Sequence, residues 1–197
     1  MEMNLPSPSI KGEMSVEEAI KRRRSVRYFK KVKLPLLHLS QLLWASQGII
    51  ERWRRTSPSA GATYPLDIFA VCKDIESVTP GIYHYLPSKH NIRLIKEGDF
   101  SLSLMEACLG QGFVGDASLV LVITAEFTRT TKRYGERGVR YVHIEVGHVG
   151  ENLYLQAESL GLATCGVGAF YDEKIKKILD LPKNFEPLYI MPFGYPI

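Results

Sequence analysis

The sequence predicts a single α+β domain over residues 1–197, and three observations favour this class. The chain is long enough to bury a sizeable core, and its 45% hydrophobic and 23% charged content is ordinary for a globular protein. Apolar helical stripes are mixed with short β-branched runs, without a repeat, a low-complexity tract or a linker. Two strand-like runs, 81–86 and 92–95, flank a Pro-Ser-Lys-His-Asn turn and are typical of a hairpin.

Two helices are expected before residue 50. Ser15 suits an N-cap and Glu18 stands at the capping-box position, so the first helix should run to about Arg24. Pro35 favours the start of the second helix, because the missing amide proton costs nothing in a first turn. Its stripe ends at Gly48 and consists of Leu36, Leu39, Leu42, Leu43 and Ser46.

The later elements follow in a mixed order. The run LVLVIT at 119–124 predicts a strand that is buried on both faces. A helix over 141–160 is apolar over most of its circumference, which indicates burial in a core or in an interface. The other expected elements are strands at 66–72, 162–170 and 188–193, helices at 101–109 and 173–179, and a loop over 52–65 and another over 129–137.

The charge balance is mildly basic, with a net charge of +4 and a pI near 8.9. Basic residues gather at 21–24, 30–33 and 52–55, and they form either a solvated surface or the site of a bound anion. No nucleic-acid-binding module accompanies them, so nucleic acid is not an expected partner. The N-terminus lacks a secretory apolar stretch and no run of eighteen apolar residues occurs, so we expect a cytoplasmic protein without a membrane partner.

Metal chemistry has little support in the sequence. Cys72, Cys108 and Cys165 are far apart and form no C-x-x-C pair. His143 and His148 are five residues apart, which separates them by about 140° on a helix, whereas a zincin pair is four apart. No metal site is expected, and both histidines are interpreted as core or surface residues.

The segment from Gly110 to Gly115 matches the pattern G-x-G-x-x-G of dinucleotide-binding folds. That pattern binds a pyrophosphate only between a strand and the helix that follows it. Here a helix precedes the segment and the strand at 119–124 follows it. We therefore interpret the segment as a glycine-rich turn.

The run Arg22-Arg-Arg-Ser-Val-Arg27 is a candidate anion site. Arginines at the end of a helix suit the negative end of its dipole, which is a purely structural explanation. Guanidinium groups beside a hydroxyl are also what a phosphate monoester needs. The residues by themselves leave both explanations open.

Two further segments are rich in small residues. The segment Ser57-Pro-Ser-Ala-Gly-Ala-Thr-Tyr-Pro65 is either a plain surface loop or a loop whose amides approach a flat ligand or a phosphate. The segment Gly161-Leu-Ala-Thr-Cys-Gly-Val-Gly-Ala-Phe170 is either a tightly packed strand or a strand on which a planar ring lies. Cys165 within it is either a reactive thiol or a small packed residue.

Four motifs in order resemble the nitroreductase-like family of FMN-dependent oxidoreductases, over about residues 15–197. They are R-R-S-x-R-x-F, S-P-S-A-G-A-T-Y-P, G-H-x-x-x-N-L-Y-L-Q-A-x-S-L-G-L and P-F-G-Y-P. The second motif and the ending after G-Y-P look most like the SagB-type dehydrogenase branch, some members of which oxidise azolines in modified peptides. The resemblance implies a central, mostly antiparallel sheet flanked by helices, in an intimate homodimer whose flavin sites are shared between subunits.

The resemblance also implies roles for particular residues. Arg23 and Ser25 would hold the phosphate and ribityl end of FMN together with Arg22 or Arg24. Arg27 would lie near N1 and O2 of the flavin ring. The other implied flavin contacts are Gln111, Cys165, Gly166, Val167 and Gly168, and from the other subunit Pro58, Ser59, Ala60 and Ala62. The helix at 141–160 would then be an interface helix.

Two departures from the family pattern stand out. Many members have further basic residues after G-Y-P, whereas this chain stops at Ile197, so the arginine run would bind more of the phosphate than is usual. Many members also have Asn where this chain has Ala62, which removes one side-chain contact.

The implied activity is hydride transfer between NADH or NADPH and an organic acceptor such as a nitro compound or a quinone. The alternatives are an FMN-dependent azoline (thiazoline or oxazoline) dehydrogenase acting on modified peptides, a flavin-binding module without catalysis, and a basic RNA-binding domain. No side chain is assigned as a catalytic acid or base. Lys132, Tyr134 and Arg140 are weak candidates for that role in the azoline case.

Overall fold

A seven-stranded sheet forms the centre of the molecule in the computed structural model, which describes all residues 1–197. The strands lie in the order β1-β6-β5-β4-β7-β9-β8, and every neighbouring pair is antiparallel. They are β1 (Glu2–Asn4), β4 (Leu66–Cys72), β5 (Gly81–Leu86), β6 (Asn91–Glu97), β7 (Leu119–Ala125), β8 (Ala163–Thr164) and β9 (Glu186–Gly194). The mixed class and the antiparallel sheet expected from the sequence are confirmed.

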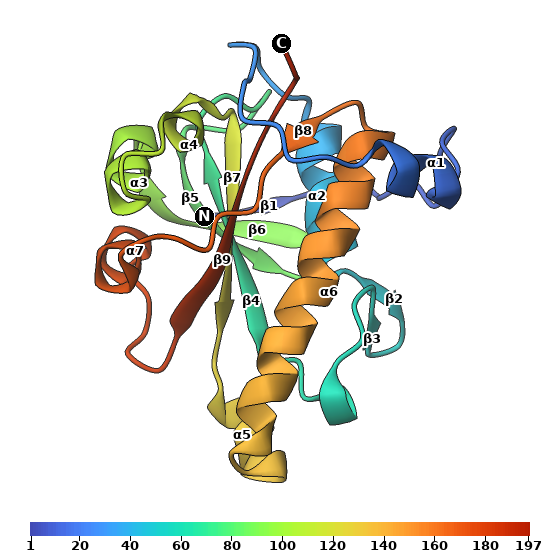
Figure 1. Cartoon of the computed structure of the whole chain (residues 1–197), viewed down its shortest axis with the longest axis vertical. Helices are drawn as coiled ribbons and strands as arrows, with labels where there is room; N and C mark the ends of the chain where they lie inside the picture. Colours follow the sequence, from blue (N-terminus) through green and yellow to red (C-terminus); the bar gives the residue numbers. More distant parts are fainter.

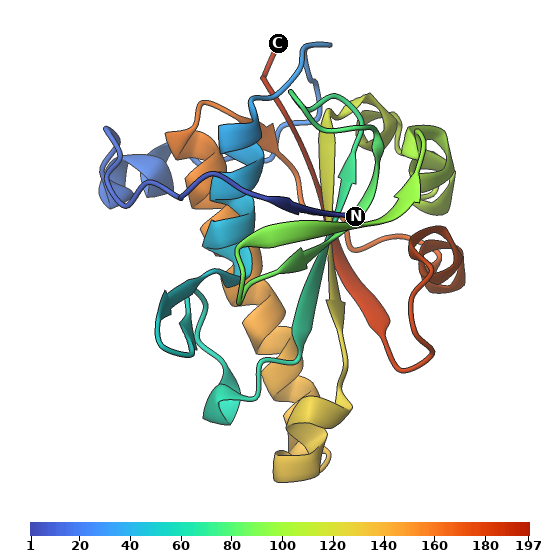
Figure 2. The same ribbon diagram turned by 180° about the vertical axis from the view of Figure 1, so that it is seen from behind.

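Helices cover both faces of this sheet, as Figures 1 and 2 show from opposite sides. They are α1 (Val16–Arg22), α2 (Leu36–Gln47), α3 (Ser101–Ala107), α4 (Gly112–Asp116), α5 (Thr128–Tyr134), α6 (Arg137–Ser159) and α7 (Asp172–Leu179). On one face, α2 and α6 pack over a core cluster of 26 buried residues. On the other face, α3, α4 and α7 pack over a cluster of 16 buried residues.

The central strand β7 shows why the sheet has a core on each side. All seven of its residues are buried, as the apolar LVLVITA run predicts. Side chains alternate across a strand, so Leu121 and Ile123 enter the larger cluster. Val120 and Val122 point the other way and enter the smaller one.

Several expected elements are confirmed in detail. The Ser15 hydroxyl caps α1 by accepting the backbone amide of Glu18 at 3.1 Å. The second helix, α2, follows Pro35 and ends before Gly48, and β5 and β6 form the expected hairpin.

Two predictions of secondary structure are wrong. Only Ala163–Thr164 of the expected strand at 162–170 forms β8, and Val167 adds an isolated bridge to Ile190. Glycines at 166 and 168 weaken a strand, which explains the early end. Residues 129–137 are not a loop, because α5 occupies most of them and α6 begins at Arg137. The TRTTKRY sequence of α5 has no apolar stripe, so helical periodicity does not reveal it.

Short elements were also missing from the prediction. The glycine-rich turn at 110–115 includes the start of α4, and β1 pairs with β6. Residues 49–55 form a small hairpin of β2 (Ile49–Glu51) and β3 (Arg54–Arg55), and Ala60–Ala62 form a 3-10 turn, η1. These elements are two to five residues long, too short for a periodic pattern to identify.

The long helix α6 is buried on one face only. Val142, Val149 and Leu153 pack on the sheet, whereas Ile144 and His148 are exposed on the opposite side. In the single chain, therefore, α6 is buried as the sequence predicts only on its face toward the sheet.

None of the helices combines the length and the apolar character that a membrane crossing needs. No three His, Cys, Asp or Glu side chains are grouped so that they could hold a metal ion.

Candidate functional site

The arginine run lies where α1 ends and lines a cavity of about 550 Å³, here called the arginine cavity. The backbone leaves the helix at Arg23 in an extended conformation and is held by Val26, whose amide donates to the carbonyl of Thr164 at 2.9 Å. The charged lining residues are Lys21, Arg22, Arg23, Arg24 and a single carboxylate, Glu158. Four cations around one anion leave a net positive charge, which suits a phosphate.

The four cations are not equivalent. Arg22 forms an ion pair with Glu18 at 2.8 Å on the surface of α1, so part of its charge is neutralised. Arg23 is less exposed than its neighbours, and its guanidinium lies over the ring of Tyr154, 5.3 Å from the ring centre. Stacking on an aromatic ring orients a guanidinium fork, so Arg23 is the best prepared of the four to hold an anion.

Tyr154 of α6 joins the arginine run to the glycine-rich segment. Its hydroxyl lies 3.1 Å from the Ser25 hydroxyl and accepts the backbone amide of Gly166 at 2.6 Å. One side chain therefore fixes the two segments relative to each other.

Arg27 and Gln111 lie beside the same segment. The Arg27 guanidinium is 5.9 Å from the centre of the Phe113 ring. The Gln111 side-chain amide donates to the carbonyls of Cys108 at 2.9 Å and of Ala169 at 3.1 Å, which ties α4 to the chain after Gly168. The structure thus brings the arginine run, Gln111 and residues 165–168 together.

The two glycines at 166 and 168 differ in their surroundings. A side chain at Gly166 would overlap the Tyr189 hydroxyl, so any larger residue here would displace the Tyr189 ring. Val167 exchanges two backbone hydrogen bonds with Ile190, at 2.8 and 3.1 Å. Gly168 is exposed, and no heavy atom lies within 4 Å of where its Cβ would be. Gly166 is therefore a packing glycine, whereas Gly168 offers open backbone to a ligand.

Cys165 is 2% exposed, and the structure records all three cysteines as free and buried. This burial fits a packed residue. Burial also raises the pKa of the Cys108 thiol to about 11, so that thiol is protonated at neutral pH.

The loop over 57–65 is anchored at its start and strained in its middle. Ser57 donates to the carbonyl of Ser46 at 3.1 Å. The φ angles of Gly61, Ala62 and Tyr64 are 58°, 53° and 45°, in the left-handed region. This conformation costs a residue other than glycine about 1–2 kcal/mol, so the surroundings must hold the loop in place.

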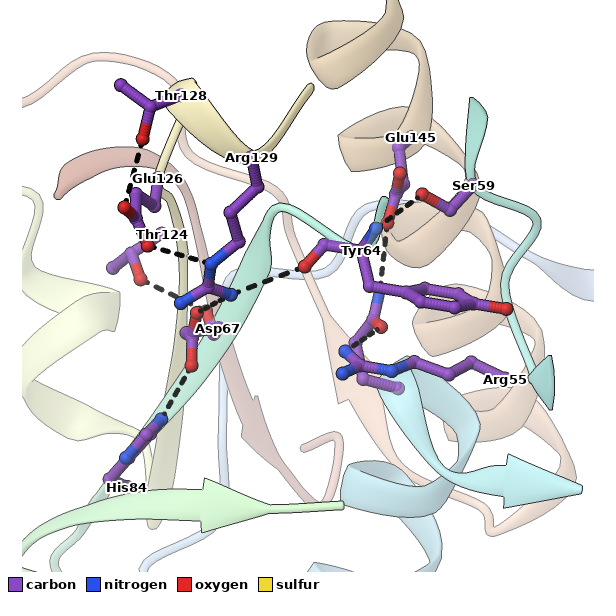
Figure 3. A network of polar contacts seen from close by, with 11 residues as sticks. Arg55, Ser59, Tyr64, Asp67, His84, Thr124, Glu126, Thr128, Arg129 and Glu145 are labelled. Carbon is purple, nitrogen blue, oxygen red and sulfur yellow. Dashed lines mark hydrogen bonds and ion pairs between the residues drawn. The ribbon is translucent and has the colours of Figure 1, made fainter. Parts of the chain in front are cut away.

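A network of polar contacts holds α5 over this loop (Figure 3). Arg129 donates to Asp67 Oδ2 at 2.7 Å, to Glu126 Oε2 at 2.8 Å and to the Tyr64 carbonyl at 3.3 Å. Burial acts to raise the pKa of Asp67, but its hydrogen bond with His84 and the charge of Arg129 outweigh burial and lower it. Asp67 is therefore a carboxylate that pins α5 to β4.

The end of α5 contacts the middle of the loop. Arg133 Nη1 donates to the Gly61 carbonyl at 3.1 Å, and a side chain at Gly61 would meet the Tyr134 hydroxyl. Tyr134 also packs edge-on against Tyr141, with ring centres 5.2 Å apart. Of the three weak acid–base candidates, Tyr134 thus lies at the loop, whereas Lys132 and Arg140 are exposed.

Glu145 of α6 is a buried carboxyl behind the loop, with 2% exposure. Gln47 Nε2 donates to its Oε1 at 3.5 Å, and Arg55 Nη1 donates to the other end of Gln47 at 2.8 Å. Figure 3 labels Glu145 and Arg55, the two ends of this chain of hydrogen bonds. Burial raises the pKa of Glu145 to about 7, although hydrogen bonds from Ser59 and Gln47 and the charge of Arg55 act to lower it. Glu145 lines a cavity of about 300 Å³, the Glu145 pocket, whose other lining residues are Pro58, Ser59, Ala60, Tyr141, Ile144 and His148.

The two sites lie at different levels of α6. Glu158 lines the arginine cavity and Glu145 lines the pocket, which places them about 20 Å apart along the helix at about 1.5 Å a residue. In Figure 1, α1 and β8 lie at the upper end of α6, and the loop that contains η1 lies toward its lower end. Within one chain, therefore, Pro58–Ala62 do not meet the arginine run.

Two residues of these sites were not identified from the sequence. Tyr154 stands inside the N-L-Y-L-Q-A part of a motif but received no role. Glu145 falls on the same helical stripe as Val142 and Val149. A charged residue on an otherwise apolar stripe is a sequence signal that could have identified it as a functional residue.

Comparison with known proteins agrees with this architecture. The model of the nitroreductase family matches residues 20–195, a range that includes both sites. A protein of Methanocaldococcus jannaschii that is named as a nitroreductase is 46% identical over 195 residues, covering 98% of this chain and 96% of the relative. The fold and the match together define an oxidoreductase class. The chain belongs to the nitroreductase family.

Solved structures relate the chain to one branch of this family. A nitroreductase structure from Anabaena variabilis matches with a TM-score of 0.88 and 27% identity, over 100% of this chain and 42% of that one. A chain of the Escherichia coli microcin synthetase McbBCD complex with truncated pro-MccB17 bound matches with a TM-score of 0.76 and 25% identity, over 96% of this chain and 75% of that one. This second likeness supports the relation to the SagB-type branch.

Proposed function

We propose that this nitroreductase-family protein is an FMN-dependent oxidoreductase that transfers hydride between NADH or NADPH and an organic acceptor such as a nitro compound or a quinone. The arginine cavity is the observation on which this rests. It gathers four cations, and Tyr154 links the arginine run to the segment that contains the open backbone of Gly168. FMN joins a phosphate to a planar ring, and these two features are what such a ligand requires.

The residues present fit FMN. A cavity of about 550 Å³ is within the usual range of about 300–1,000 Å³ for small-molecule sites. Arg23, Arg24 and Ser25 would hold the phosphate and ribityl end, with Arg22 as a more distant cation. Gln111 and the segment Cys165–Gly168 would border the ring. Since the amides of Gly166 and Val167 are already engaged, the amide of Gly168 is the proposed donor to the flavin.

Bound FMN would supply the two-electron chemistry. Arg27 would stabilise negative charge at N1 and O2 of the ring, because a fixed cation favours charge that develops beside it. Its stacking near Phe113 holds the guanidinium in place for this purpose. The nicotinamide and the acceptor would then occupy the same open face in turn.

A second copy of the chain is proposed to complete the flavin site. The loop with Pro58, Ser59, Ala60 and Ala62 is far from the arginine cavity of its own chain. The exposed face of α6, including Ile144 and His148, lies beside that loop. Association through this face of α6 would bring the loop of one subunit to the flavin of the other.

A second candidate function is an FMN-dependent azoline dehydrogenase acting on modified peptides. The likeness to a chain of the microcin synthetase complex, which has a peptide bound, favours it. Hydride would then pass from the substrate to the flavin, and oxygen would be the final acceptor. A flavin-binding module without catalysis is a third possibility.

Absorption spectroscopy of the purified protein separates these functions. We expect a yellow protein whose flavin band bleaches on anaerobic addition of NADH or NADPH and recovers with a nitro compound or a quinone. A yellow protein that bleaches only with an azoline peptide indicates the second candidate. One that responds to no donor indicates a binding module, and a colourless protein that takes up no FMN contradicts all three.

A further inference from the structure

We propose that Glu145 is the proton donor of the pocket between α6 and the loop at 58–60, and that this pocket receives a two-electron acceptor that takes up a proton as it is reduced. The inference rests on the proposed oxidoreductase function and assigns a residue that the flavin site itself does not use. The pocket borders the loop that is proposed to reach the flavin of the partner subunit. A substrate there would lie between the flavin and Glu145.

The pocket is lined on one side by a stripe of α6. Tyr141, Glu145 and His148 are four and three residues apart, so their side chains lie on one face of the helix. Pro58, Ser59 and Ala60 form the opposite wall. The cavity of about 300 Å³ is at the lower end of ligand pockets, so it suits a small group such as a nitro, carbonyl or imine function.

The surroundings of Glu145 explain why its pKa is raised to about 7. Its carboxyl is buried and forms no ion pair. The cation nearest in the network, Arg55, contacts Gln47 and the ring of Tyr64 instead. A buried carboxyl without a direct cation takes up a proton, because an unpaired buried charge costs several kcal/mol.

The surroundings also accommodate the carboxylate that remains after proton transfer. The Ser59 hydroxyl accepts the amide of Tyr64 at 2.9 Å, which leaves its own proton free to be donated to Glu145. Gln47 donates from a second side, and Arg55 adds a positive charge behind Gln47. Groups that stabilise either protonation state allow the residue to lose and regain a proton in each cycle.

The proposed step balances in atoms and electrons. An acceptor X=Y takes a hydride at Y, with both electrons supplied by reduced flavin. The O–H bond of Glu145 breaks as the X–H bond forms, and its electron pair stays on the carboxylate. The product is HX–YH, and water that enters the pocket after product release returns the proton to Glu145.

The first test measures the carboxyl itself and needs no turnover. Infrared difference spectra over pH 5–9 on the purified protein should show a protonated carboxyl band that is lost with a midpoint near pH 7. The band should be absent from Glu145→Gln and present in Glu151→Gln, which removes an exposed carboxyl of the same helix. Ser59→Ala should move the midpoint upward, since the hydrogen bond from Ser59 lowers the pKa.

The second test separates the two half-reactions. Glu145→Gln should leave flavin content and the rate of flavin reduction by the nicotinamide unchanged. Acceptor reduction should slow by about 10²–10⁴-fold, the usual effect of losing a general acid, and lose its decline above pH 7. Glu151→Gln should retain the wild-type rate and pH profile.

The outcomes distinguish this inference from the proposed function. A protein that binds no flavin overturns the proposed function, while the infrared band still reports on Glu145. A flavoprotein in which Glu145→Gln reduces the acceptor at the wild-type rate and pH profile overturns the proton-donor role alone. A carboxyl band that survives Glu145→Gln, or that titrates near pH 4, overturns it as well.

Discussion

The arginine cavity and the Glu145 pocket bring charged side chains to ligands in opposite ways. In the arginine cavity, guanidinium groups at the surface line a site that can bind an anion, and Tyr154 orients Arg23. In the pocket, burial holds a carboxyl near its neutral form, and Gln47 separates it from Arg55. A solvated cluster of guanidinium groups can therefore bind an anion, whereas a buried carboxyl without a directly bound cation can take up a proton.

The largest expected effect tests the burial of Glu145. Its pKa of about 7 in the native state exceeds an unfolded value of about 4.3, so the native state binds more protons between these values. Stability should therefore fall as the pH rises through this window, by up to about 3 kcal/mol. Thermal unfolding at pH 5 and pH 8 measures this loss.

The matched variants for that experiment are Glu145→Gln and Glu151→Gln. The first should remove most of the pH dependence, because an amide does not titrate, and the second should preserve it. If the wild type and Glu145→Gln lose stability equally between pH 5 and pH 8, Glu145 is not the buried acid described here.

The next largest effect concerns the arginine cavity. Arg23→Ala should weaken FMN binding by about 1.5–3 kcal/mol, or roughly 10–150-fold, because a hydrogen bond to a charged group is lost. Equilibrium dialysis or fluorescence quenching of added FMN measures the affinity. Arg54→Ala, an exposed arginine of the β2–β3 hairpin with a 3.9 Å contact to Glu51, is the control and should leave the affinity unchanged. Full flavin occupancy in Arg23→Ala would contradict the assignment of the phosphate site.

A glycine pair tests the segment 165–168, which is proposed to border the flavin ring. Gly166→Ala should destabilise the protein by about 1–3 kcal/mol, since the new methyl group overlaps Tyr189. Gly168→Ala meets no neighbour, so its stability should stay within about 0.5 kcal/mol of wild type while its FMN affinity falls. Chemical denaturation and FMN titration of both variants separate packing from ligand contact. Equal stability loss in the two variants would show that position 168 is not open.

The smallest effect concerns strain in the loop that closes the Glu145 pocket. Ala62 has a φ of 53°, where asparagine is tolerated better than alanine. Ala62→Asn should therefore stabilise the protein by about 1 kcal/mol at most, seen as a higher melting temperature. Ala60→Asn has no left-handed strain to relieve and should give no gain. A gain in Ala60→Asn equal to that in Ala62→Asn would exclude strain as the cause.

The sequence predicted a large part of the fold because the major elements are long and regular. The stripe of α2, the cap of α1 and the apolar run of β7 are local patterns, and each forms as expected. The prediction failed where long-range contacts decide. The strand that begins at Ala163 ends after Thr164, where Gly166 lies against Tyr189 of β9 and its amide donates to the Tyr154 hydroxyl of α6. The helix α5 is held to β4 by Arg129 and Asp67, which are 62 residues apart.

Residue identities and their spacing already reveal the chemistry available to this protein. They show an arginine run with a hydroxyl, two segments rich in small residues and the order of motifs that marks the nitroreductase family. These features are local, so residue identities and spacing are enough to reveal them. Which of these features meet depends on how the chain folds. The fold placed Tyr154 between Ser25 and Gly166, separated the 57–65 loop from the arginine cavity, and buried Glu145. Burial and contact depend on elements far apart in the chain, and they set the protonation state of a carboxyl that the sequence shows only as one more glutamate.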